Sequence, residues 1–346
     1  MLSKIAGYLR IIRKGVERCL QEEGFSVEAF KTLFFQSIRN VVVLPDESIL
    51  EKMLAALICG GHILLHDVPG VGKTLLARTF SRALGLSFSR IQFTPDLLPS
   101  DVTGINYFNQ KTREFEFRPG PVFTNVLLAD EINRATPRTQ SSLLECMQEA
   151  TVTVDGETRK IAFPFLVLAT ENPLEMEGTF PLPEAQLDRF FMCLNLGYPG
   201  FEEEKTIVRR FLNDDPLADV KPVATVADLV TLKKMTAEVK FSEPVLNYML
   251  AIVRETRKMD GVRLGVSPRG TLYFARAAQA LALLRGRNYV IPDDLQELAV
   301  PVLAHRLLLE ISASLQDLTR AELIKQVVGS VEVPLDVEYG MKADEP

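Results

Sequence analysis

The first half of the chain alternates short apolar runs with stretches of helical periodicity. The apolar runs predict buried strands at residues 62–66, 88–93, 125–130, 163–169 and 190–194. Apolar residues spaced along one helix face predict helices at 26–43, 48–60, 75–84 and 132–149. Strands that alternate with helices are typical of a parallel sheet, so we expect an α/β core.

Two other stretches predict β-hairpins. Residues 105–108 and 114–117 alternate in polarity around a turn at 109–113. Residues 151–154 and 159–163 flank Asp155-Gly156, a favoured hairpin turn. The aromatic side chains of the first hairpin allow two interpretations: they bind a substrate, or they pack against the rest of the protein.

The second half of the chain reads as helical after a boundary at Tyr198-Pro199-Gly200. Helices are predicted at 201–212, 226–239, 242–259, 267–284, 292–309 and near 318–328. Ser242 and Ser267 are each followed within two residues by Pro, and both have the character of N-caps. Residues 331–346 are predicted to be a loose tail.

The N-terminal segment combines apolar and basic residues. Residues 1–20 carry Leu and Ile at helical spacing, and five Lys or Arg residues interrupt them. A signal peptide needs an unbroken apolar core, which these charges exclude, and no other stretch has the length of a membrane span. We expect a helix that packs on its own domain or on a neighbouring subunit, with contact to a membrane surface as the alternative. The expected location is the reducing cytoplasm.

A glycine-rich turn lies between the first predicted strand and the next helix. Gly70 and Gly72 allow successive N–H groups to point at phosphate oxygens, and the following helix adds its positive end. Lys73 can reach the terminal phosphates, and the Thr74 hydroxyl can bind Mg²⁺. Strand, turn and helix in this order predict a P-loop. Asp67 stands where the general pattern has Gly, and because Asp adopts left-handed backbone conformations more readily than most residues, we expect the loop to keep its form.

Polar side chains end two other predicted strands. Asp130 and Glu131 follow the apolar run at 125–129, which is the Walker B pattern. Asp130 is placed to hold Mg²⁺, and Glu131 to polarise the water that attacks the γ-phosphate. Asn172 follows the strand at 163–169 and is a candidate for orienting that water, or it only begins a turn before Pro173.

Length, charge and cysteine content narrow the function further. The 346 residues suffice for two domains, and the formal charge of −6 argues against a strongly basic nucleic-acid surface. The four cysteines include no CxxC pair, and the three histidines form no ligand cluster in the sequence. Metal chemistry is therefore expected to rest on carboxylate, hydroxyl and phosphate ligands of Mg²⁺.

The order of these motifs resembles that of the AAA+ ATPases, and three blocks resemble the MoxR family in particular. The blocks are residues 67–74 (DVPGVGKT), 130–135 (DEINRA) and 181–190 (PLPEAQLDRF). The resemblance extends over roughly residues 36–330. It implies a P-loop AAA+ αβα core with a parallel sheet, followed by an all-α helical lid domain. The implied division is an N-terminal helical extension at 1–35, the ATPase core at 36–198, the lid at 199–330 and a tail at 331–346.

The resemblance also implies roles for individual residues, with ATP and Mg²⁺ as cofactors. Asn172 matches sensor 1, Arg269 the sensor 2 arginine, and Arg189 the arginine finger that reaches a neighbour's nucleotide. Whether Arg269 acts within its own subunit or on a neighbour stays open. Together with Glu131 these form the implied catalytic set. The implied nucleotide-binding residues are Asp67, Val68, Pro69, Gly70, Val71, Gly72, Lys73, Thr74, Leu75 and Asp130, of which Thr74 and Asp130 hold the metal.

The function implied is an ATPase that works as a ring, usually a hexamer, and remodels or activates a protein partner. In the family that partner often carries a von Willebrand factor A domain. The alternative is a nucleic-acid motor, because related clades use the same two hairpins, the helix-2 insert and the pre-sensor-1 hairpin, on DNA. Lys111, Arg113, Arg159 and Lys160 near the hairpin turns would serve that function, although the acidic total charge counts against it.

Overall fold

The computed structural model describes residues 25–43, 46–67, 70–171, 178–212, 216–310 and 319–334. The predicted N-terminal helix and most of the predicted tail lie outside these residues. Val68, Pro69 and Asn172 lie outside them as well.

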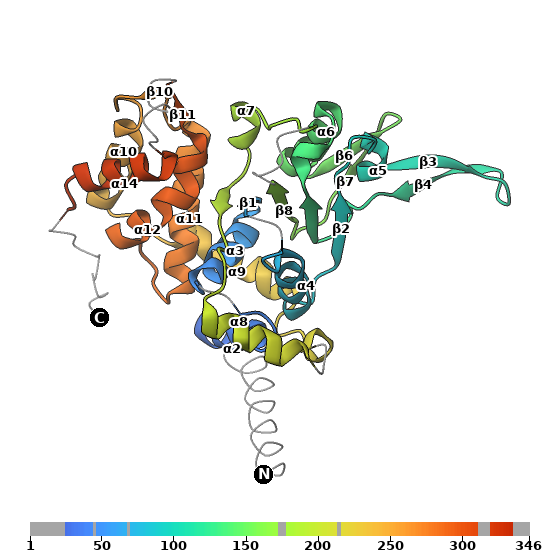
Figure 1. The fold of residues 1–346 in the computed structure, drawn as a ribbon, viewed down its shortest axis with the longest axis horizontal. Coiled ribbons are helices and arrows are strands. Elements are labelled where there is room, and N and C mark those ends of the chain that lie inside the picture. Colours follow the sequence, from blue (N-terminus) through green and yellow to red (C-terminus); the bar gives the residue numbers. More distant parts are fainter. Residues whose placement is uncertain are drawn as a thin grey trace, which may run out of the picture.

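A five-stranded parallel sheet forms the centre of the molecule (Figure 1). Its order is β2 (Phe88–Gln92), β5 (Val126–Asp130), β8 (Leu166–Glu171), β1 (Ile63–His66) and β9 (Met192–Leu194). All four neighbouring pairs run parallel, which confirms the predicted α/β core. Parallel strands bring their carboxyl ends to one edge, so the loops after β1, β5 and β8 meet there.

Alternate side chains of each strand enter two different apolar layers. In β5, Val126 and Leu128 pack with helices α2 (Val27–Arg39), α3 (Ser48–Cys59) and α4 (Lys73–Ala83). Leu127 and Ala129 pack with α5 (Pro99–Thr103) and α6 (Pro137–Glu149) on the opposite face. A sheet buried on both faces explains why the strands read as continuous apolar runs. The αβα arrangement is confirmed.

Several predicted elements are shorter in the structure than in the sequence analysis. The predicted helix at 132–149 is a 3₁₀ turn, η1 (Ile132–Arg134), followed by α6, because Thr136 before Pro137 is extended. The predicted strand at 163–169 begins only at Leu166, since Pro164 has no N–H to donate. These corrections leave the order of elements unchanged.

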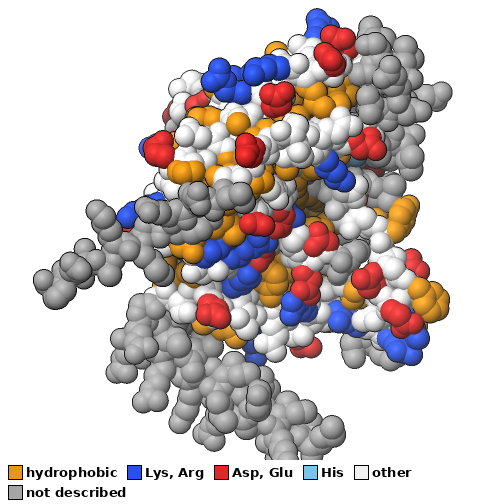
Figure 2. Space-filling view, turned by 90° about the vertical axis from the view of Figure 1, so that its left-hand side faces the viewer, with side chains coloured by type: hydrophobic (Ala, Val, Ile, Leu, Met, Phe, Trp, Pro, Cys, Tyr) orange, Lys and Arg blue, Asp and Glu red, His pale blue; other side chains and the backbone are white. Residues whose placement is uncertain are grey.

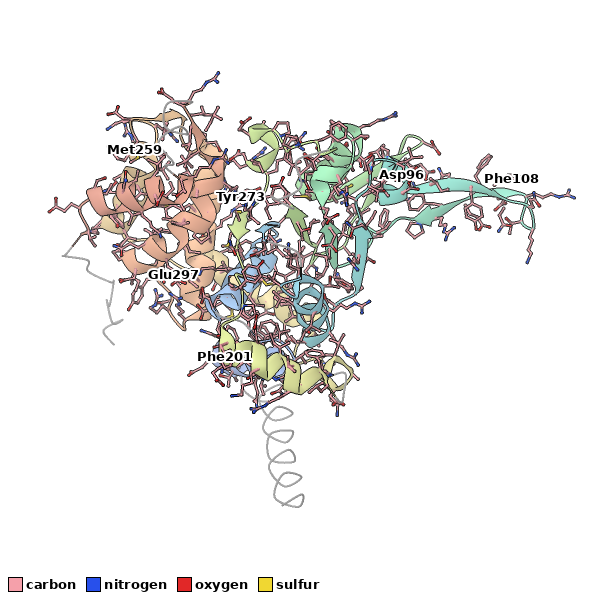
Figure 3. All side chains as sticks on the ribbon, in the orientation of Figure 1. Asp96, Phe108, Phe201, Met259, Tyr273 and Glu297 are labelled. Carbon is pink, nitrogen blue, oxygen red and sulfur yellow. The ribbon has the colours of Figure 1, made fainter. Side chains whose placement is uncertain are left out.

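Both predicted hairpins are present. Strands β3 (Gly104–Asn109) and β4 (Glu114–Pro119) form one, and β6 (Thr151–Val154) and β7 (Glu157–Lys160) form the other. The second is shorter than predicted, because β7 ends at Lys160. The β3–β4 hairpin projects from the body of the molecule and carries Phe108 far from the sheet (Figure 3). Phe108 and Phe115 pack on each other across its strands but stay largely exposed, so this pair covers neither core layer.

The second half of the chain is mainly helical, as predicted. Its helices are α8 (Phe201–Phe211), α9 (Val226–Glu238), α10 (Glu243–Glu255), α11 (Pro268–Leu284), α12 (Pro292–Leu303) and α14 (Arg320–Ser330), with 3₁₀ turns η2 (Pro216–Asp219) and η3 (Ala304–Arg306). A short helix α7 (Glu184–Leu187) precedes β9 in the first half. The helices predicted at 242–259 and 292–309 end early, at Glu255 and Leu303. After them, β10 (Val262–Leu264) pairs with β11 (Leu308–Leu309). Gly261 in the left-handed region allows the turn that starts β10.

Helices α10, α11, α12 and α14 form a lid beside the sheet (Figure 1). Helix α11 packs directly on α3 of the core, and the buried residues of both belong to one continuous apolar cluster. Helix α8 lies beside α2, and Arg210 donates to the Arg39 carbonyl oxygen at 2.6 Å. No helix within the described ranges has the length and apolar character needed to cross a membrane.

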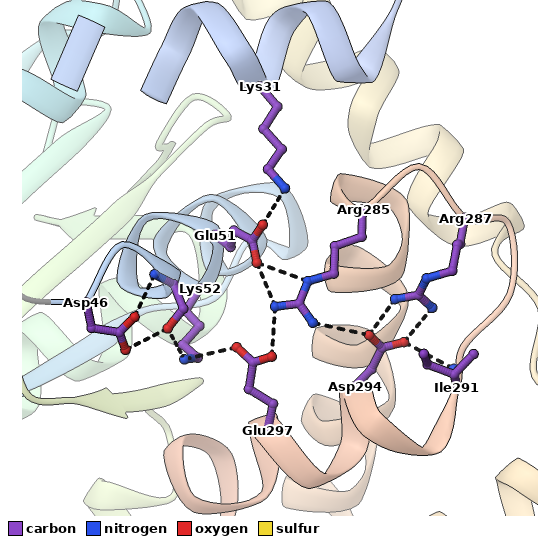
Figure 4. A network of polar contacts seen from close by, with 10 residues as sticks. Lys31, Asp46, Glu51, Lys52, Arg285, Arg287, Ile291, Asp294 and Glu297 are labelled. Atoms are coloured by element: carbon purple, nitrogen blue, oxygen red, sulfur yellow. Dashed lines mark hydrogen bonds and ion pairs between the residues drawn. The ribbon is translucent and has the colours of Figure 1, made fainter. Parts of the chain in front are cut away.

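A network of charged side chains also joins the lid to the core (Figure 4). Glu51 of α3 accepts hydrogen bonds from Lys31 of α2 and from Arg285, whose Nη2 lies 2.8 Å away. Burial disfavours the ionised form of Glu51, but these two cations outweigh it, and the pKa of the carboxyl is lowered. Arg285 follows α11 and also contacts Glu297 of α12 at 2.7 Å. The lid and the core therefore share a partly buried ion network as well as apolar contacts.

Candidate nucleotide site and the arginine edge

A cavity of about 410 Å³ opens at the carboxyl ends of β1, β5 and β8. It is lined by Asp67, Gly70, Gly72, Lys73, Thr74, Leu75, Arg90, Gln92, Asp130, Glu131, Thr170 and Glu171. The structure thus brings the P-loop and both Walker B carboxylates together, as the sequence predicted for the edge of a parallel sheet.

Both glycines of the P-loop have a left-handed backbone conformation. Gly70 and Gly72 have φ values of 87° and 86°, where a side chain is strained, and Gly72 caps the N-terminus of α4. Lys73 begins that helix and donates to the Asp67 carbonyl oxygen at 2.8 Å. Burial lowers the pKa of Lys73, although the charges of Asp67, Asp130 and Glu131 oppose the shift. Lys73 thus lies at a helix N-terminus, where phosphate groups are bound.

Asp67 has a different role from the one predicted. Among the described residues the positive-φ positions other than glycine do not include Asp67, so a left-handed backbone is not the reason for this residue. Its buried carboxylate instead accepts hydrogen bonds from the backbone N–H groups of Leu196, at 2.7 Å, and Gly197, at 3.1 Å. Asp67 therefore fastens the start of the P-loop to the segment after β9, which a Gly could not do.

Each Walker B carboxylate is held by a side chain of β2. Arg90 Nε lies 2.6 Å from Asp130 Oδ2, and Gln92 Nε2 lies 2.6 Å from Glu131 Oε2. Thr170 of β8 donates to Asp130 at 3.3 Å and accepts from the Glu131 N–H at 2.8 Å. The sequence analysis missed all three partners. The signal available was the pair of polar residues two apart at the end of a predicted strand, which places them on one face.

Glu131 has an unusual backbone conformation. Its φ of 56° lies in the left-handed region, which is uncommon for a residue with a side chain. Such conformations are found preferentially at functional sites, where the surrounding structure maintains them. Here the bond from its N–H to Thr170 and the contact of its carboxylate with Arg134, at 3.1 Å, fix it on both sides.

A second, mostly apolar pocket of about 270 Å³ adjoins the P-loop. Its walls are Val41, Val42, Val43, Gly70, Val71, Gly72, Leu75, Leu196, Gly197, Tyr198, Pro199, Glu204, Ile207 and Phe211. It shares Gly70, Gly72 and Leu75 with the larger cavity, so the two pockets adjoin along the loop. The sequence analysis did not anticipate this pocket, because its walls come from three distant segments with no common motif.

Arg189 and Arg269 lie away from both pockets. Arg189 lines a separate space of about 400 Å³ together with Glu145 and Glu149 of α6. Arg269 is the second residue of α11 in the lid, and its Nη1 lies 4.0 Å from Asp188, the residue before Arg189. We call the group Asp188, Arg189 and Arg269 the arginine edge. The structure brings the two predicted arginines near each other but places neither in the cavity that contains Lys73.

The donor set of the cavity fits a hard divalent cation. The Thr74 hydroxyl and the Asp130 carboxylate line the same space, and Mg²⁺ prefers a few such oxygen ligands together with phosphate and water. Within the described ranges no group of three His, Cys, Asp or Glu side chains gathers into another metal centre. Asn172 lies outside the described residues, so its role as sensor 1 stays a prediction.

Comparison with known proteins agrees with this site. The family described as "ATPase family associated with various cellular activities (AAA)" matches residues 62–192, and the AAA lid domain matches residues 254–327. A crystal structure of a proposed ATPase from Cytophaga hutchinsonii superposes with a TM-score of 0.83 at 37% identity, covering 89% of this chain and 96% of that one. The protein is therefore an AAA+ ATPase with a helical lid.

Individual relatives define the family more closely. The chaperone MoxR1 of Mycobacterium tuberculosis is 44% identical over 306 residues, which cover 86% of this chain and 80% of that protein. Protein MoxR of Methylorubrum extorquens is 31% identical over 324 residues, covering 86% and 92%. YeaC of Bacillus subtilis is 48% identical over 296 residues, covering 86% and 92%. The chain belongs to the MoxR family.

Proposed function

We propose that this ATPase binds ATP with Mg²⁺, assembles into a hexameric ring, and uses hydrolysis to remodel a protein partner. One observation carries the proposal: Lys73, Thr74, Asp130 and Glu131 line one cavity, whereas Arg189 and Arg269 lie outside it. A site divided in this way needs a second subunit to bring arginines to the nucleotide.

Within the cavity each side chain has a distinct task. The backbone N–H groups of the P-loop and Lys73 would hold the phosphates, and Thr74 and Asp130 would hold Mg²⁺, which neutralises phosphate charge when bound. Glu131 is placed to accept a proton from the attacking water. The hydrogen bond from Gln92 holds the Glu131 carboxylate in the cavity. Asn172 is proposed to orient the same water.

The apolar pocket supports an adenine nucleotide. A purine base is flat and largely apolar, and the pocket offers Val41, Val42 and Phe211 beside the P-loop. The proposed orientation places the base between α8 and the segment after α2, with the phosphates at Gly70 and Gly72.

The arginine edge supports action on a neighbouring subunit. Arg189 and Arg269 lie beside Asp188, so we propose that both reach the nucleotide of the next subunit. A guanidinium beside the γ-phosphate stabilises the charge of the transition state and is worth on the order of 10³ to 10⁵ in rate. The sequence left the direction of Arg269 open, and its position beside Asp188 favours action in trans.

A protein partner suits the exposed surface better than a nucleic acid. The projecting β3–β4 hairpin exposes Tyr107, Phe108 and Phe115. Its charged side chains are of both signs, with Glu114 and Glu116 beside Lys111, Arg113 and Arg118. On the lid side of the molecule, basic and acidic side chains are interspersed (Figure 2). Nucleic-acid surfaces instead gather basic residues in one stripe. A partner with a von Willebrand factor A domain stays a proposal drawn from the family.

A trapping experiment tests the proposed function. The Glu131→Gln protein should bind ATP without hydrolysing it and should retain the partner, while Lys73→Ala, which cannot hold nucleotide, serves as the matched control. Proteins captured by Glu131→Gln with ATP, but not by Lys73→Ala, would be the partners. A mass measurement on the same samples should show nucleotide-favoured rings. Identical capture by both variants, or a strict monomer with every nucleotide, would contradict the proposal.

A further inference from the structure

A buried arginine of the lid lies behind the arginine edge. Arg306 belongs to η3, and its side chain is 1% exposed. Its Nε lies 3.1 Å from Asp188 Oδ1, and its Nη2 donates to the carbonyl oxygen of Phe190. These are the residues immediately before and after Arg189. A single guanidinium from the lid therefore holds the chain on both sides of the proposed arginine finger.

The same carboxylate also connects Arg306 to the start of α11. Both oxygens of Asp188 lie 3.0 Å from Ser267 Oγ, the N-cap of the helix on which Arg269 is the second residue. Arg269 Nη1 lies 4.0 Å from the same carboxylate. Arg189 and Arg269 are thus both next to the ion pair of Asp188 with Arg306. The lid residues that contact Asp188 are 79 or more positions away in the sequence.

The surroundings are built to hold this guanidinium in place. Arg306 also donates to the Val302 carbonyl oxygen and lies over the ring of Tyr273, 5.4 Å from its centroid. Tyr273 lies on the side of the lid that faces the core and contacts Phe191 (Figure 3). Gly270 leaves room for the side chain, because a Cβ there would come within 2.7 Å of Arg306 Cδ. Burial lowers the pKa of Arg306 to about 10, even with Asp188 opposing the shift, so the group stays charged at neutral pH.

We propose that Arg306 is a positioning residue that fixes Arg189 and Arg269 relative to each other, so that the lid sets the geometry of the arginines offered to the next subunit. It does not reach the nucleotide itself. This inference rests on the proposed action of Arg189 in trans. It predicts that loss of the Arg306 guanidinium lowers the rate of ATP hydrolysis as loss of Arg189 does, but by a smaller factor.

The test uses Arg306→Lys in the full-length protein, because Lys keeps the charge but cannot bind Asp188 and the Phe190 carbonyl oxygen as a planar fork. We expect kcat to fall by about ten- to a hundredfold with KM for ATP nearly unchanged, since a misplacement of about 1 Å has an effect of this size. Arg254→Lys, an exposed arginine on α10, is the matched control and should keep the normal kcat.

Mixed rings separate this inference from the proposed function. Arg306→Lys subunits should regain activity when mixed with Glu131→Gln subunits, and should not regain it with Arg189→Ala subunits. If Arg189→Ala is rescued by Glu131→Gln but Arg306→Lys is not, the positioning role is wrong. If Arg189→Ala itself is not rescued in demonstrated mixed rings, the action in trans is wrong. Should Arg306→Lys fail to fold, Gly270→Ala, which displaces Arg306 and changes no charge, goes through the same mixing with the same two outcomes.

Discussion

The nucleotide cavity and the arginine edge are built in opposite ways. The cavity takes its side chains from the loop after β1 and from the carboxyl ends of β2, β5 and β8, so each contribution is a short local motif. The arginine edge depends on contacts between Asp188 or Phe190 and lid residues 79 and 116 positions further along the chain. The first region is a property of the sheet edge, whereas the second exists only when the lid packs on the core. We therefore expect changes in the cavity to affect nucleotide binding, and changes in the contacts between lid and core to affect turnover.

The largest predicted effect concerns the cavity itself. Lys73→Ala removes a partly buried ammonium from the phosphate site and should weaken ATP binding by at least about a hundredfold. Glu131→Gln keeps the shape of the side chain but cannot accept a proton, so binding should persist while turnover falls by about 10² to 10⁴. Equilibrium binding of a labelled nucleotide and a steady-state ATPase assay check the two variants. Equal binding and equal residual turnover in both would remove the distinction between the two roles.

The next effect concerns the attachment of the lid. Glu51→Gln takes the carboxylate from half-buried ion pairs with Lys31 and Arg285, and we expect a loss of about 2 kcal/mol in the free energy of unfolding. Because the pair joins α3 to the end of α11, turnover should fall while nucleotide affinity changes little.

Glu47→Gln is the matched control for that prediction. Glu47 pairs with Arg39 at an exposed position, where ion pairs contribute only a few tenths of a kcal/mol, up to about 1 kcal/mol. Denaturant unfolding of both variants, alongside nucleotide binding, makes the comparison. A Glu51→Gln protein as stable as Glu47→Gln would show that the network does not hold the lid.

A smaller effect depends on pH. His62 is buried before β1, where its Nδ1 accepts from the Val167 N–H at 3.0 Å and its Nε2 contacts the Met147 carbonyl oxygen at 2.8 Å. Burial lowers its pKa to about 4. Between pH 6.5 and pH 4, His62 is protonated in the unfolded chain but stays neutral in the folded protein. The free energy of unfolding therefore falls as the pH drops from 6.5 towards 4. At pH 5 the loss from His62 is about 2 kcal/mol.

His62→Gln should flatten this part of the pH dependence, because Gln does not titrate. Unfolding curves at pH 7 and pH 5 measure the slope, and His66→Gln, at an exposed position, is the control. Burial also lowers the pKa of His305, which contacts the Phe190 carbonyl oxygen behind the arginine edge, so some acid sensitivity should remain in the variant. If the free energy of unfolding of His62→Gln depends on pH as strongly as that of the unaltered protein, His62 is not the source of the acid sensitivity.

The sequence predicted the regions whose physics is local. The strands, both hairpins, the P-loop and the Walker B pair depend on residue spacing and turn chemistry, which a sequence displays directly. Asp67 was located correctly but explained wrongly, because its partners Leu196 and Gly197 lie far along the chain. The partners Arg90, Gln92 and Thr170, the apolar pocket and the β10–β11 pair were missed for the same reason. Each is defined by contacts between segments that only folding brings together.

If one active site is shared between two subunits, as we propose, mixing two inactive variants should restore activity. Arg189→Ala lacks the proposed arginine finger but keeps its cavity, and Glu131→Gln lacks the proposed catalytic carboxylate but keeps Arg189. Mixed rings should regain ATPase activity, with a maximum at intermediate ratios, because an Arg189→Ala cavity then receives Arg189 from a Glu131→Gln neighbour. No recovery at any ratio, in rings shown by mass to contain both variants, would contradict the account.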